Sequence, residues 1–255
     1  MLLQPGQMSS PKVRGGNPIL RLTNMNHYSD PALSQITYHE GNAIKDVMPL
    51  AGINIMQQQD PLLAMEFVPD AFNGLGGYGF PATNRFMIYD ADPTPFQVER
   101  TMGIVFEAIG PFANNQIFGF SKSTSFNTHW RVGSHTSSGG SINFGRQETG
   151  LGEFPILVPA GGHLGQQHIL IIRQVSLDRH EFYFNSYTDP IIINPQDNYF
   201  TSNRVRIVLG RTFSGRSETG AVIGPIFDAY DLATDKQIER IAKYLSARTG
   251  IALNQ

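Results

Sequence analysis

The sequence predicts an all-β protein: an antiparallel β-sandwich with an extended N-terminal arm and one C-terminal α-helix. Short apolar stretches alternate with turn clusters along most of the chain, and only one segment has strong helical periodicity. The composition agrees, because 26 Gly and 16 Pro supply many turns while charged residues make up only 16%. Strands joined by turns and not by helices favour a sandwich over a parallel α/β fold.

About a dozen short segments have the character of strands, and the turns between them carry Gly, Pro, Asn, Asp and Ser. In the segment 203–211, Val205, Ile207 and Leu209 alternate with Arg206, which is the period-two pattern of a half-buried antiparallel strand. The predicted strands are 62–69, 85–90, 100–110, 115–121, 128–134, 140–146, 154–159, 167–175, 180–186, 190–194, 203–211 and 222–231.

The single helix is predicted over 234–250, near the end of the chain. Thr234 is a good N-cap, Gln237 three residues later completes a capping box, and Gly250 is placed for a C-cap. The apolar face, at positions i, i+3, i+4 and i+7, consists of Ile238, Ile241, Ala242 and Leu245. Such a helix must lay this stripe on a sheet or against an edge of the sandwich.

Residues 1–30 are rich in Gly, Pro, Ser, Asn and Gln and show little periodicity, which predicts an extended arm. Two interpretations of the arm stay open: a frayed terminus, or a segment that docks on a neighbouring subunit. The remaining residues, 31–255, show no internal repeat and no sign of a second domain, so they are predicted to form one sandwich.

The charge and cysteine content narrow the classes of protein. The net charge is −2, which gives no overall attraction to nucleic acid or to an anionic membrane. The absence of cysteine excludes disulfides and thiolate metal sites. The N-terminus has no apolar region of signal-peptide length, and no apolar run approaches the length of a membrane span. We therefore expect a chain made in the cytoplasm without a signal peptide and without membrane insertion.

The C-terminal segment GPIFDAYDLATDKQIERIAKYLSARTGI resembles the end of concanavalin A-like jelly-roll domains of the LamG/pentraxin type. The positions that carry the resemblance are Gly224, Ile226, Tyr230, Asp231, Leu232, Thr234, Asp235, Ile241, Tyr244, Leu245, Gly250 and Ile251. Upstream, HILIIRQVSLDRHEFYFNS resembles the family hairpin that ends in Tyr-x-Asn-Gly, with Ser186 in place of the Gly. DAFNGLGGYGF (70–80) resembles an early segment, and the likeness is dispersed over about 60–252.

The resemblance implies a concanavalin A-like jelly roll, a fold that occurs in bacterial and phage surface proteins. It implies a non-catalytic structural or binding module in a virion or on an extracellular surface, such as a phage decoration, tail or fibre protein. The implied partners are other virion or surface proteins, further copies of the chain, and a cell-surface glycan. The alternatives are a carbohydrate-binding lectin and, third, a glycoside hydrolase.

No catalytic residues are predicted. Glycoside hydrolysis needs two carboxylates across the sugar bond, and the alternating Glu-x-Asp-x-Glu strand of the sandwich glucanases is missing. Glu66 and Asp70 straddle a strand end, and Asp90 and Asp92 lie in a turn sequence. The stretch Gly74–Gly79 matches G-x-G-x-x-G, but strand residues follow it where a nucleotide site needs a helix, so a glycine turn is predicted.

No cofactor is predicted, and one metal site stays open as an alternative. A lectin-type Ca²⁺ site draws several oxygen ligands from loops. Asp90, Asp92, Asp189 and Asn194 are available donors, but no spacing identifies a site among them. The metal ligands therefore stay unknown. The alternative interpretation is that these four residues form turns and bind no metal.

Carbohydrate sites often place an aromatic ring against the sugar, and Trp130 is the only tryptophan. It precedes a polar Ser/Gly loop of the kind that carries recognition surfaces, although a lone Trp is also typical of a core. The predicted ligand-binding residues are Trp130, Arg131, His135, Asn185 and Tyr187.

Overall fold

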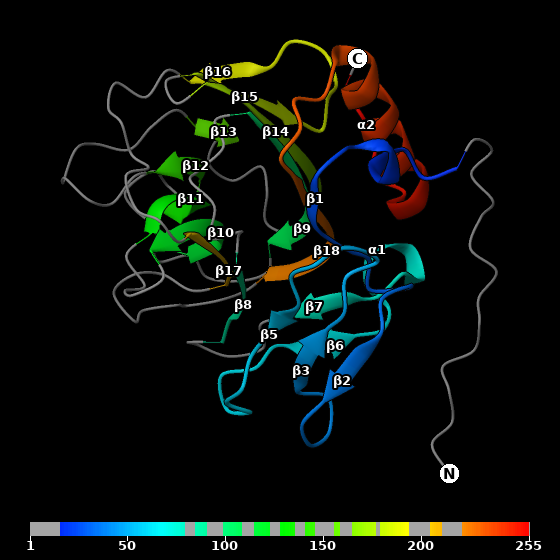
Figure 1. Cartoon of the computed structure of the whole chain (residues 1–255), viewed down its shortest axis with the longest axis vertical. Helices are drawn as coiled ribbons and strands as arrows, with labels where there is room; N and C mark the ends of the chain where they lie inside the picture. Colours follow the sequence, from blue (N-terminus) through cyan, green and yellow to red (C-terminus); the bar gives the residue numbers. More distant parts are fainter. Residues whose placement is uncertain are drawn as a thin grey trace.

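Two antiparallel sheets pack face to face, and the C-terminal helix lies on the outer side of one of them (Figure 1). The computed structural model describes residues 16–79, 85–90, 99–108, 115–122, 128–135, 141–145, 156–158, 165–176, 179–193, 205–210 and 221–254. Within these residues the chain is mostly strand, and the predicted all-β sandwich is confirmed. The molecule therefore has three layers in the order helix, sheet A and sheet B.

Sheet A carries the helix. Its strands, from edge to edge, are β16 (Ile191–Ile193), β15 (Arg179–Phe184), β14 (Gln167–Ser176), β9 (Arg100–Ala108), β18 (Ala221–Ala229), β1 (Met25–Ser29) and β4 (Ala51–Gly52). β7 (Gly77–Gly79) also pairs with β18, and β6 (Glu66–Val68) pairs with β7. Every pairing is antiparallel, as expected for strands joined by turns.

Sheet B forms the other layer. Its order is β13 (Ile156–Val158), β12 (Ser141–Gly145), β11 (Thr128–His135), β10 (Asn115–Lys122), β17 (Val205–Leu209), β8 (Met87–Asp90), β5 (Met56–Gln57), β3 (Ile44–Val47) and β2 (Ile36–Tyr38). β17 holds the predicted period-two strand. Its Ile207 and Leu209 are fully buried against sheet A, which confirms their inward orientation.

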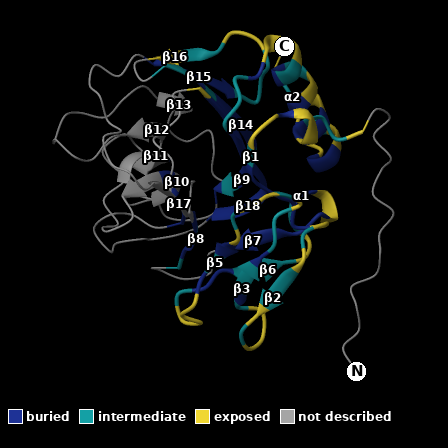
Figure 2. Ribbon diagram, viewed as in Figure 1, coloured by how far each residue is buried: buried dark blue, intermediate teal, exposed yellow. Residues whose placement is uncertain are grey.

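The main core lies between the sheets and takes residues from both layers. From sheet A it includes Ile104 on β9 and Ile172 on β14, and from sheet B it includes Met87 and Ile207. Residues two positions apart on a strand share a face, so this core also fixes which face of each strand looks inward. The buried residues of sheet A can be followed in Figure 2.

A second apolar cluster lies between sheet A and α2 (Asp235–Thr249). The helix has the predicted capping box between Thr234 and Gln237, and it ends at Gly250 in the left-handed conformation, with φ of 77°. The whole predicted stripe of Ile238, Ile241, Ala242 and Leu245 is buried there. The helix therefore covers apolar surface on the outer face of the sheet, as the sequence predicted.

The predicted arm is wrong over its second half. Residues 16–30 belong to the sandwich: η1 (Pro18–Arg21) packs beside α2 through the buried Ile19, and β1 lies in sheet A between β18 and β4. His27 pairs with Asp228, 201 positions later, in an antiparallel register. Residues 1–15 lie outside the described part of the chain, so the arm stays a prediction for them alone.

The glycine-rich stretch is a turn between β6 and β7, as predicted. α1 (Ala71–Gly74) begins it, and Phe72 and Asn73 have left-handed backbone angles, with φ of 49° and 59°. This conformation is unfavourable for a bulky side chain. The buried Phe72 ring lies against Gly224, where an added Cβ would meet its Cδ2 at 3.0 Å, so close packing accompanies the turn.

Candidate functional site

The five predicted ligand-binding positions lie on two different sheets. Trp130, Arg131 and His135 are on β11 of sheet B, where Trp130 pairs with Phe120 and His135 pairs with Ser141. The side chains of these three residues lie outside the described part, so their role stays a prediction. Asn185 and Tyr187 follow β15 of sheet A.

Asn185 is held by hydrogen bonds to three different segments of the chain. Its Oδ1 accepts a hydrogen bond from the Ile169 backbone N–H at 2.7 Å, and its Nδ2 lies 3.1 Å from His168 Nδ1. Its carbonyl accepts from the Asn254 N–H at 2.6 Å. The residue has a positive φ of 47°, which asparagine tolerates better than most residues. These contacts tie the end of β15 to the start of β14 and to the C-terminal segment.

Tyr187 is partly buried against the cluster beneath α2. The Lys243 ammonium lies 4.9 Å from the centre of its ring, in a cation–π contact between the helix and the β15–β16 connection. One face of the ring is thus occupied by the helix. Whether the residue also contacts a ligand stays a prediction.

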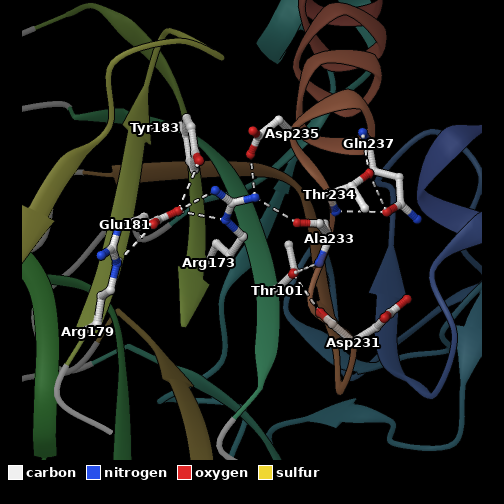
Figure 3. Close-up of polar contacts among 10 residues, drawn as sticks. All are labelled: Thr101, Arg173, Arg179, Glu181, Tyr183, Asp231, Ala233, Thr234, Asp235 and Gln237. Carbon is white, nitrogen blue, oxygen red and sulfur yellow. Dashed lines mark hydrogen bonds and ion pairs between the residues drawn. The ribbon is translucent and has the colours of Figure 1, made fainter. Parts of the chain in front are cut away.

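A network of charged groups joins sheet A to the first turn of α2 (Figure 3). Arg173 donates from Nε to Glu181 at 2.7 Å, and from Nη1 to the Ala233 carbonyl at 2.9 Å and to Asp235 at 2.6 Å. Arg179 donates to the other oxygen of Glu181 at 2.9 Å. Burial tends to raise the pKa of Glu181, but the two guanidinium groups outweigh burial and lower that pKa. Glu181 is therefore held as a carboxylate between two cations.

A second buried pair anchors the other end of the helix. Arg248, in the last turn of α2, lies with its Nη2 2.7 Å from Asp30 Oδ2, and the two side chains are 4% and 0% exposed. Burial raises the pKa of Asp30, although Arg248 acts in the opposite direction. This pair holds the C-terminal turn of the helix to the residue that follows β1.

The most buried polar cluster lies between the two sheets. The Arg100 guanidinium donates from Nε and Nη2 to both oxygens of Asp228, and both side chains are completely buried. Asn26 on β1 donates a further hydrogen bond to Asp228 Oδ2 at 2.7 Å. The Arg100 guanidinium carbon also lies 4.9 Å from the centre of the Tyr230 ring. A bidentate pair with a third donor is the arrangement that best compensates two charges removed from water.

His27 extends this cluster across to sheet B. Its ring stacks on Tyr89 of β8, with centroids 4.3 Å apart and planes 17° from parallel. Nδ1 lies 2.7 Å from the Asn54 carbonyl, which can only accept, so Nδ1 carries the proton and Nε2 accepts from Ser29 Oγ at 3.0 Å. Burial lowers the pKa of His27 to about 4, against the opposing effects of the Asn54 carbonyl and Asp228. His27 is neutral at pH 7.

Within the described part of the chain, each buried carboxylate is paired with arginine: Asp30, Glu181 and Asp228. Glu66 is paired as well, with Arg85 at 2.7 Å. No three His, Asp or Glu residues of that part gather as metal ligands, and no helix of it is long and apolar enough to cross a membrane. Asp92 and Asn194 lie outside the described residues, so the calcium alternative is untested.

Sequence reasoning missed the cluster between the sheets. Arg100, Asp228 and His27 are far apart in the chain and belong to no local motif. The one available signal is the placement of polar residues at the end of otherwise apolar strand segments, as in IFDAYD. That signal does not identify a partner, because the register between distant strands decides which residues meet.

No family model and no curated protein sequence matches the chain. Among solved structures it is similar to Trypanosoma rangeli sialidase, with a TM-score of 0.59 and 8% identity, over 94% of this chain and 36% of that one. The chain thus spans about a third of the length of the sialidase. A structure titled as a receptor binding domain matches with a TM-score of 0.55 and 9% identity, over 84% of this chain and 51% of that one.

A third similar structure is domain 4 of AbnA, an extracellular GH43 arabinanase of Geobacillus stearothermophilus, in complex with arabinotriose. It matches with a TM-score of 0.58 and 10% identity, over 87% of this chain and 99% of that one. At such identities the likeness establishes the fold alone. The LamG resemblance itself stays a prediction, and what the comparisons establish is that this chain folds as a β-sandwich of a kind found in these proteins.

Proposed function

We propose that this chain is a non-catalytic binding module whose β-sandwich recognises a carbohydrate. The likeness to domain 4 of the arabinanase carries the proposal. It covers nearly all of that domain and most of this chain, so two whole sandwiches correspond and not a shared fragment. That domain was solved in complex with arabinotriose. Fold likeness alone does not transfer a ligand, so the proposal needs a direct binding test.

The arrangement of the carboxylates supports a role without catalysis. A glycosidase pair needs one carboxyl group that can give a proton and one that can act as base or nucleophile. Asp228 and Glu181 are each bound by a guanidinium group, which occupies the oxygens that would have to react. These two buried carboxylates are thus poor candidates for acid–base chemistry.

The C-terminal resemblance suggests the setting. A module of this kind would sit on a virion or another extracellular surface structure, where it would attach to a glycan or to neighbouring surface proteins. The bacteriophage setting rests on the sequence of the segment 224–251 and is independent of the glycan proposal.

The test is binding of the purified chain to an array of plant cell-wall, bacterial capsular and sialylated oligosaccharides, with calcium and with EDTA. We expect at least one saturable response, and no release of sugar when the same oligosaccharides are incubated with the protein. Trp130→Ala and Tyr187→Ala then test the residues predicted from the sequence. Absence of binding to every saccharide would overturn the proposal, and turnover would replace it with the hydrolase alternative.

A further inference from the structure

Sheet A ends at β4, a short strand flanked by exposed aliphatic side chains. Within the described part of the chain, β4 pairs on one side only, with β1. Leu50 precedes the strand and is 38% exposed, and Ile53 and Ile55 follow it with 80% and 39% exposed. We call these three side chains the β4 patch. An open strand edge beside apolar surface attracts other segments, and proteins generally cover or charge such edges.

The segment around the β4 patch lacks the charged side chains that commonly protect an open edge. No Asp, Glu, Lys or Arg occurs between Asp46 and Asp60. A charged partner would lose hydration on this surface without gaining an opposite charge from the segment. The composition therefore favours an uncharged, apolar segment as the occupant of the patch.

Residues 1–15 join the described part of the chain close to this edge. Asn17 donates from Nδ2 to the Tyr28 hydroxyl at 2.8 Å. Tyr28 on β1 is the register partner of Ala51 on β4, so Asn17 is held one strand away from the edge. Gly16 is exposed, with a φ of 74° and nothing within 4 Å of an added Cβ. Glycine adopts this conformation readily, so the chain has room to turn toward β4 at this point.

The sequence of residues 1–11 matches the chemistry of the patch. These residues include no Asp, Glu, Lys or Arg, and their large apolar side chains are Met1, Leu2, Leu3 and Met8. An extended chain advances about 3.3 Å per residue, so a few residues before Gly16 are enough to reach β4. A tethered segment also has a high effective concentration at a nearby surface, which favours it over a second copy. We propose that residues 1–11 cover the β4 patch of their own chain.

The test uses the whole chain, which contains no cysteine and so accepts a single label at a chosen position. Ser9→Cys carrying a nitroxide broadens the NMR signals of amides that lie near it. We expect the amide signals of residues 50–55 to lose most of their intensity, and to regain it when the nitroxide is reduced. Thr188→Cys is the control position, because it is exposed after β15, near the opposite edge of sheet A. The same label there should leave residues 50–55 unchanged.

A matched pair of variants tests whether the apolar side chains hold the segment. Ile53→Ser, combined with the label at position 9, should restore most of the intensity of residues 50–55. Leu62→Ser should not, although Leu62 is also 80% exposed, because it lies outside the β4 patch. Equal broadening in both variants would mean that the patch does not hold the segment, and the proposal would fall.

A mixing experiment separates the chain's own segment from that of a second copy. Nitroxide-labelled chain without isotope label is mixed with isotope-labelled chain without nitroxide. We expect no broadening of residues 50–55 in this mixture. Broadening there would assign the patch to a second copy, and no broadening in the singly labelled chain would leave residues 1–11 away from the edge. Either result would overturn the proposal, while the proposed carbohydrate binding would stand.

Discussion

Two charged contacts on opposite faces of sheet A differ sharply in burial: the Arg173–Asp235 contact on the outer face and the Arg100–Asp228 pair on the inner face. On the outer face, the Arg173 network lies at the margin of the helix, and Asp235 is 87% exposed. On the inner face, Arg100 and Asp228 are both completely buried between the sheets. Exposed pairs add little to stability because water already solvates their charges, whereas a buried pair is indispensable once it is in place. The exposed Asp235 contact should therefore tolerate substitution better than the buried Arg100–Asp228 pair.

The comparison is tested most strongly by removing one acceptor from each face. Asp228→Ala leaves the Arg100 charge buried without its counterion, and should lower the free energy of unfolding by about 3–5 kcal/mol. Asp235→Ala removes an acceptor of Arg173 on the outer face, and should cost less than about 1 kcal/mol. Urea unfolding of both variants gives the two values. Equal losses would mean that the faces do not differ as described.

The next largest expected effect is a loss of stability at low pH, caused by protonation of His27 on the inner face. Its folded pKa of about 4 lies below the unfolded value of 6.5, so the unfolded chain binds the proton first as the pH falls. Stability contributed by neutral His27 is complete above pH 6.5 and is lost as the pH falls toward 4. A shift of this size corresponds to about 3 kcal/mol. The free energy of unfolding measured between pH 7 and 4 should show this slope.

Other groups titrate in the same range, so the slope must be assigned by difference. His27→Gln keeps a polar side chain and removes the titration. The variant should be less stable at pH 7, since it loses the stacking on Tyr89, but its stability should change less between pH 6.5 and 4. An unchanged slope in the variant would assign the acid sensitivity to another group.

The N-terminal cap of α2 tests the contribution of a more exposed contact on the outer face of sheet A. Thr234 accepts from the Gln237 N–H at 3.3 Å, and the Gln237 side chain accepts from the Thr234 N–H at 2.8 Å. Thr234→Ala removes one of these bonds and should cost about 1 kcal/mol. Thermal unfolding measures the effect, and Thr234→Ser, which retains the hydroxyl, should restore most of it. A variant as damaging as Asp228→Ala would be inconsistent with an exposed cap.

The smallest effect is expected on the solvent side of the helix. Lys243 Nζ lies 2.6 Å from Glu239 Oε1, one turn apart. Both groups are well hydrated, so Glu239→Gln should leave the urea midpoint unchanged within error at physiological salt. A clear loss of stability would show that even this exposed ion pair contributes to stability. The difference between exposed and buried contacts would then be smaller than described.

The outer face could be predicted because its signals are local. The capping box, the apolar stripe of α2 and the closing Gly250 all lie within 17 consecutive residues of the sequence, Thr234 to Gly250. An amphipathic helix also needs a surface to cover its apolar stripe, so the pattern predicts a sheet beneath it. The alternation in β17 was equally local, and Ile207 and Leu209 point inward as predicted.

The inner polar groups could not be predicted in the same way. β1 reads Met-Asn-His-Tyr-Ser, which has no apolar period, so the sequence predicts it as part of the arm. Its polar side chains are buried because they bond to partners elsewhere: Asn26 to Asp228 and His27 to Asn54. Which polar residues find such partners depends on strand pairings across about 200 positions. The local sequence does not predict that strand register.

The place of β18 in sheet A has a consequence for biosynthesis. This strand pairs with β9 on one side and β1 on the other, and it supplies Asp228 to the buried pair. Until the ribosome has released residues 221–229, the strands that emerged first have a missing neighbour at the centre of the sheet. The nascent chain must keep two open strand edges apart from other chains until then, and such edges attract aggregation. Completion of sheet A is therefore expected to wait until residues 221–229 have left the ribosome, with this closure as the slow step.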